Sequence, residues 1–63
     1  MKRGALVRLQ NLTSRKDING SHGLIVGPVE ESGRWLVRLK GGEGKQLKPH
    51  NLHTLSHAGG VVH

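Results

Sequence analysis

Apolar and polar residues alternate along several stretches of the chain, and this pattern predicts short strands. Residues 4–10 carry Val7 and Leu9 two positions apart, which places both side chains on one face of a strand. Residues 34–39 show the clearest alternation, and residues 22–29 group β-branched side chains between glycines. We therefore predict strands over these three stretches, each with one apolar face.

The segments between these strands carry turn signals. Residues 11–21 are mostly polar and contain Asn19-Gly20, a pair that tolerates positive φ and marks a turn, so they predict a long loop. A short helix beginning at Ser14 remains an alternative there. The other predicted elements are a bulge or bend at Gly27-Pro28, turns at 30–33 and 40–44, short strands at 45–48 and 53–55, and one helical turn at 49–52.

Five short strands at this spacing predict an all-β fold, either a small barrel or a sandwich. A barrel is favoured, because closing the sheet removes exposed strand edges. We predict one domain over residues 1–55 and a loose tail over 56–63. The predicted core consists of Val7, Leu9, Leu12, Ile18, Ile25, Val29, Trp35, Val37, Leu39, Leu47, Leu52 and Leu55.

Composition narrows the range of functions. The 63-residue chain has no cysteine, so thiolate metal sites and disulfides are excluded, and ten glycines favour turns over helices. A net charge of +6 favours polyanionic partners such as RNA, DNA or acidic protein segments. No apolar run is long enough for a membrane span or a signal peptide. We expect a soluble protein without a visible targeting signal, whose compartment stays open.

The motifs resemble those of a widespread SH3-like barrel module that occurs in multidomain proteins of algae and protists. The resemblance rests on Gly33-Arg34-Trp35-Leu36-Val37-Arg38-Leu39 and on Lys45-Gln46-Leu47-Lys48-Pro49-His50-Asn51-Leu52, within a match over 4–52. It implies an SH3-like small barrel of about five short strands, with one helical turn before the last strand. KOW-type and Tudor-type barrels are neighbouring groups. Members of such groups bind quite different partners.

Catalysis and cofactor binding are not expected. The four carboxylates are scattered over predicted turns, away from the burial that shifts pKa values for acid–base chemistry. We predict no catalytic, cofactor or small-molecule site. One exception is a remote alternative: Lys45-Gln46-Leu47-Lys48-Pro49 is similar to the central motif of tetrameric, plasmid-encoded dihydrofolate reductases. Lys48 stands where that motif has tyrosine.

The histidines near the C-terminus predict no metal site. His50, His53 and His57 are spaced three and four residues apart, which would align them on a helix. Pro49 leaves room for only one helical turn, and no carboxylate is nearby in the sequence. We therefore interpret them as solvent-exposed side chains.

A protein-binding or assembly domain is the first functional hypothesis. Sites of the SH3 and Tudor type need exposed aromatic side chains, and the only aromatic residue, Trp35, falls on the predicted core face. Two modes of binding remain: an acidic or extended segment of a partner could bind along a sheet edge, or the chain could self-associate. Four apolar side chains lie opposite the predicted core and form the candidate interface: Leu6, Leu24, Val26 and Leu36.

A basic, KOW-like clamp on RNA or DNA phosphates is the alternative hypothesis. Without aromatic stacking platforms, its contacts would be electrostatic and independent of base sequence. The candidate phosphate-binding residues are Arg8, Arg15, Lys16, Arg38, Lys40 and Lys48.

Overall fold

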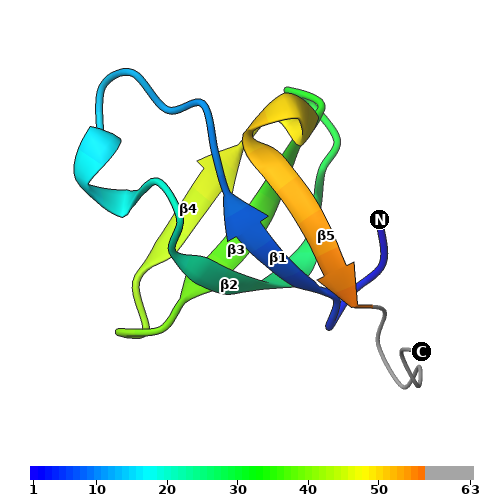
Figure 1. The fold of residues 1–63 in the computed structure, drawn as a ribbon. Helices are drawn as coiled ribbons and strands as arrows, with labels where there is room; N and C mark the ends of the chain where they lie inside the picture. The colour runs from blue at the N-terminus through cyan, green and yellow to red at the C-terminus, as the bar shows by residue number, and fades with distance from the viewer. Residues whose placement is uncertain (57–63) are drawn as a thin grey trace.

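The fold, a computed structural model that describes residues 1–56, is an all-β domain of five antiparallel strands (Figure 1). The strands are β1 (Leu6–Leu9), β2 (His22–Val29), β3 (Arg34–Leu39), β4 (Gly44–Leu47) and β5 (Leu52–Ser56). Two 3-10 turns, η1 (Lys16–Ile18) and η2 (Pro49–Asn51), precede β2 and β5. The five strands and the helical turn before the last one are confirmed as predicted.

One five-stranded sheet has the order β4-β3-β2-β1-β5, so sequence neighbours pair except where the last strand joins the first. Figure 1 shows the sheet strongly bent, with β1 and β5 lying in front of β3 and β4. Hydrogen bonding among the described residues does not close the sheet, because β4 and β5 form its two edges. We predicted that closure into a barrel would leave no exposed strand edge. For backbone hydrogen bonding this prediction is wrong, since two edges remain. Both edge strands are short, which limits the unpaired backbone they present.

The predicted irregularity in β2 lies one residue earlier than expected. Pairing between β2 and β3 shifts register between Ile25 and Gly27, so Val26 has no partner of its own in β3. A bulge of this kind increases the local twist of a strand. It helps the sheet bend around its core while burial still alternates along β2.

The core draws side chains from all five strands, and Val7, Leu9 and Val37 are fully buried in it. Most of the predicted core is confirmed, with Leu12, Ile18 and Trp35 only partly buried against it. Val29 and Leu55 were expected inside and are half-buried, because each lies near the end of its strand. The buried residues are Ala5, Val7, Leu9, Ile25, Val37, Leu39, Leu47 and Leu52.

Gly23 in the middle of the sheet is required by close packing. A Cβ atom at this position would lie 2.6 Å from Cγ1 of Val37 and 3.1 Å from the carbonyl oxygen of Arg38. We expect Gly23→Ala to lower the free energy of unfolding by about 1–3 kcal/mol, the usual cost of overpacking. Urea denaturation would measure this.

Gly41→Ala is the matched control for that substitution. It adds the same methyl group in a turn where nothing lies within 4 Å of the new atom. Its unfolding midpoint should stay close to that of the wild type. Equal losses in the two variants would show that the clash with Val37 does not matter.

Residues 57–63 lie outside the described part of the chain, and they include most of the predicted tail. Ser56, predicted to begin that tail, is the last residue of β5. Within residues 1–56, no helix has the length and apolar character needed to cross a membrane.

Candidate functional site

A basic groove runs between the loop after β1 and the segment formed by β4 and η2. It encloses about 500 Å³. Four successive residues of the edge strand and its end, Lys45 to Lys48, line one side, so the groove follows the free edge of β4. The complete lining is Asn11, Leu12, Thr13, Ser14, Arg15, Ile18, Arg34, Lys45, Gln46, Leu47, Lys48, His50 and Asn51.

Asn51 fixes the two walls of this groove to each other. Its side-chain Nδ2 donates to the carbonyl oxygens of Gln10 at 3.0 Å and Asn11 at 3.2 Å. The backbone N–H of Gln10 donates in return to the carbonyl of Asn51 at 2.9 Å. Asn51 is the only buried polar residue in the described chain, being 8% exposed. Its hydrogen bonds compensate the cost of burying an amide.

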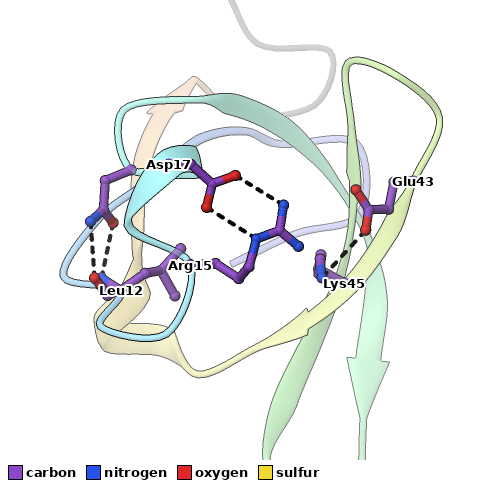
Figure 2. A network of polar contacts seen from close by, with 6 residues as sticks. Leu12, Arg15, Asp17, Glu43 and Lys45 are labelled. Carbon is purple, nitrogen blue, oxygen red and sulfur yellow. Dashed lines mark hydrogen bonds and ion pairs between the residues drawn. The ribbon is translucent and has the colours of Figure 1, made fainter.

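The loop between β1 and β2 is also held internally. The amide side chain of Asn19 bonds both backbone groups of Leu12, accepting from its N–H at 2.9 Å and donating to its carbonyl at 3.0 Å (Figure 2). Gly20, at φ 86°, donates its N–H to the carbonyl of Leu9. Leu12 and Ile18 then pack against the core. The long polar segment thus has a defined shape. The alternative of a short helix beginning at Ser14 is met only in part, since η1 is a single 3-10 turn that begins at Lys16.

The groove is electropositive. Arg15, Arg34, Lys45 and Lys48 line it, and no carboxylate of residues 1–56 does. Two of these cations have acidic partners nearby: Arg15 forms a two-pronged pair with Asp17, and Lys45 lies 3.3 Å from Glu43 (Figure 2). Both pairs are at least partly exposed, so they add little stability, and each offsets part of the charge of its cation. Arg34 and Lys48 form no ion pair within residues 1–56.

The hydrogen bond from Arg15 holds the pKa of Asp17 below its usual value, and the same contact raises the pKa of Arg15. A carboxyl with a lowered pKa in the folded state contributes stability above its unfolded pKa. That contribution is lost as the pH falls through the folded value. The ion pair is therefore fully formed at neutral pH. Arg15 loses this partner only when the pH falls low enough to protonate Asp17.

The six predicted phosphate-binding residues do not all line one hollow. Arg15 and Lys48 line the basic groove, whereas Arg38 and Lys40 line a hollow elsewhere. Arg8 lies on the outer face of β1, and Lys16 is exposed in η1 outside both hollows. The groove members that sequence analysis missed are Arg34 and Lys45. The alternation of β3 places Arg34 on an exposed face, but only the tertiary fold brings the loop against it.

The four predicted interface residues lie on the face of the sheet opposite the core. Leu6 pairs directly with Leu24 across β1 and β2. Leu24 is 49% exposed and Val26 40% exposed, whereas Leu6 and Leu36 are half-buried. Beside the first pair is a second concavity of about 370 Å³, here called the outer hollow. Its lining is Leu6, His22, Gly23, Leu24, Arg38, Leu39, Lys40 and Gly42.

Potential metal ligands are dispersed. No three histidine, aspartate or glutamate side chains within residues 1–56 come together as a metal site would require. His50 lines the basic groove and His53 lies on β5, while His57 is outside the described residues.

No protein-family model, curated protein or solved structure matches this chain significantly.

Proposed function

We propose that this chain is a non-catalytic interaction module of the SH3-like barrel class that binds an acidic, extended segment of a partner protein. The basic groove carries the proposal, since it combines four cations with no lining carboxylate along the free edge of β4. The bent five-stranded sheet, the 3-10 turn before β5 and the motif resemblance support the SH3-like assignment.

The shape and chemistry of the groove favour a peptide. Its floor includes the apolar side chains of Leu12, Ile18 and Leu47, and its rim carries the amides of Asn11 and Gln46. No described strand pairs with the outer side of β4, so a bound segment can hydrogen-bond to that edge. Arginine and lysine side chains along it can then pair with acidic side chains of the bound segment.

A labelled polyglutamate peptide tests this function by fluorescence anisotropy. Arg34→Glu combined with Lys48→Glu reverses two cations of the groove and should weaken binding on the order of tenfold or more. Lys2→Glu combined with Lys16→Glu makes the same change in net charge outside the groove. That control should lose far less affinity. Equal losses in the two double variants would refute a defined groove, because only net charge would then matter.

A nucleic-acid clamp is the second candidate, favoured by Arg8 on the outer face of the sheet. Arg8 pairs directly with His22 of β2 and with His53 of β5. The guanidinium of Arg8 can bind a phosphate group there. Tight binding of labelled single-stranded RNA that Arg8→Gln abolishes, and that the groove variant leaves intact, would support the clamp instead.

The dihydrofolate reductase analogy is the remote candidate. It requires four copies around a shared pore lined by Gln46 and Lys48, both of which are exposed in the single chain. Light scattering tests it first, because a monomer is incompatible with such a pore.

A further inference from the structure

We propose that the outer hollow is a second docking site, which takes an apolar side chain of a partner peptide flanked by acidic residues. This site is distinct from the basic groove, since the two share no lining residue. A peptide bound there would lie against the outer face of β1, β2 and β3.

The walls of the outer hollow are apolar. Leu6 and Leu24 are direct cross-strand partners and line the hollow together with Leu39, a residue of the core. Gly23 lines the hollow through its backbone, since a Cβ atom there would point toward Val37 in the core. Leu24 remains half exposed beside this concavity. An apolar group entering the hollow would bury this surface.

The rim of the outer hollow is cationic. Arg38 pairs directly with Leu24 across β2 and β3, and Lys40 and His22 complete the rim. No carboxylate of the described chain lines it. The complementary ligand therefore carries negative charge next to its apolar group.

A second copy of this chain does not meet that requirement. A symmetric dimer through this face would bring two cationic rims into one interface. Each chain also carries a net charge of +6. An acidic partner segment relieves this repulsion, whereas a second copy doubles it.

A membrane surface fits the shape less well than a peptide does. The hollow is concave, so it suits one inserted side chain rather than a flat layer of lipid. Proteins that lie on membranes usually place tryptophan or tyrosine at the interface. Here the only aromatic residue, Trp35, packs against the core.

Nuclear magnetic resonance of the full chain can locate the binding. The probe is the peptide Glu-Glu-Leu-Leu-Glu-Glu, and the control peptide has serine in place of both leucines. We expect the probe to shift the backbone amide signals of Gly23, Leu24 and Lys40, and the control peptide to leave them nearly unchanged. Identical shifts with both peptides, or shifts confined to the basic groove, would overturn the proposal.

Two matched substitutions in β2 complete the test. Leu24→Thr removes an apolar wall of the hollow and keeps a strand-favouring residue, so leucine-dependent binding should weaken about tenfold. Val26→Thr is the control, because Val26 is similarly exposed on the same strand but does not line the hollow. Equal effects of both substitutions would contradict the assignment.

A variant of the basic groove distinguishes binding at the outer hollow from the proposed binding in the groove. Arg34→Glu combined with Lys48→Glu should leave the leucine-dependent shifts at Gly23 and Leu24 in place. Their loss in that variant would show that the peptide needs the groove and would overturn an independent site. Binding to vesicles of anionic phospholipid that needs Leu24, without any binding of the peptide, would instead assign the hollow to membranes.

Discussion

Leu9→Ala is expected to leave much of the protein unfolded at room temperature. Leu9 is fully buried at the end of β1, a strand that lies between β2 and β5. Truncating a buried leucine to alanine costs about 3–5 kcal/mol, because it removes apolar contacts and leaves a cavity. A domain of this size has a total stability on the order of 3–9 kcal/mol. The substitution therefore removes a large part of the total free energy of unfolding.

Circular dichroism with urea titration would measure that loss. Leu24→Ala is the matched control, since it deletes the same atoms from a side chain that is half exposed on the adjacent strand. It should cost less than about 1 kcal/mol. Similar losses in the two variants would mean that the core is not organised around β1 as described.

Asn51→Asp is expected to lower the free energy of unfolding by about 2–4 kcal/mol although the two side chains have the same shape. The asparagine donates to the carbonyl oxygens of Gln10 and Asn11. A carboxylate has no N–H to donate and would place a partly buried negative charge against both oxygens. The effect should shrink in acid, because a protonated carboxyl can donate one hydrogen bond again.

This substitution should also disturb binding. Asn51 joins the loop after β1 to η2, so its loss lets the two walls of the basic groove separate. We expect weaker binding of polyglutamate under conditions where the variant is still folded. Asn11→Asp is the control, since Asn11 is exposed and its side chain makes one long contact of 3.5 Å with His50. An equally large loss there would show that Asn51 has no special role.

The strands could be predicted because the local sequence determines them. Alternation places His22–Val29 and Arg34–Leu39 with the bounds that the structure has, and the intervening turn residues separate them. The central core residues were predictable. Burial at the strand ends, as for Val29 and Leu55, was less so, because it depends on which other segments cover those ends. Ala5 is fully buried but too small to stand out in a hydrophobic pattern.

The candidate sites were less predictable, because they depend on contacts between distant segments. Arg34 lines the basic groove together with Arg15, which lies far from it in the sequence. The loop carrying Arg15 is positioned by the side chains of Asn19 and Asn51, whose roles no periodicity indicates. Charge alone grouped Arg8 with Arg15, whereas in the fold Arg8 lies on β1 and Arg15 lies on the loop after it, in the basic groove.

The strand order has a consequence for how the chain reaches its native state. Strands β2, β3 and β4 are joined by short turns and can pair as soon as they are synthesised. Strand β1 lies inside the sheet, yet one of its two neighbours is the last strand, so Leu9 has to pair with Leu52 far along the chain. Closing so long a stretch of chain is entropically slow. During synthesis on the ribosome, one edge of β1 therefore lacks its strand partner until β5 has emerged.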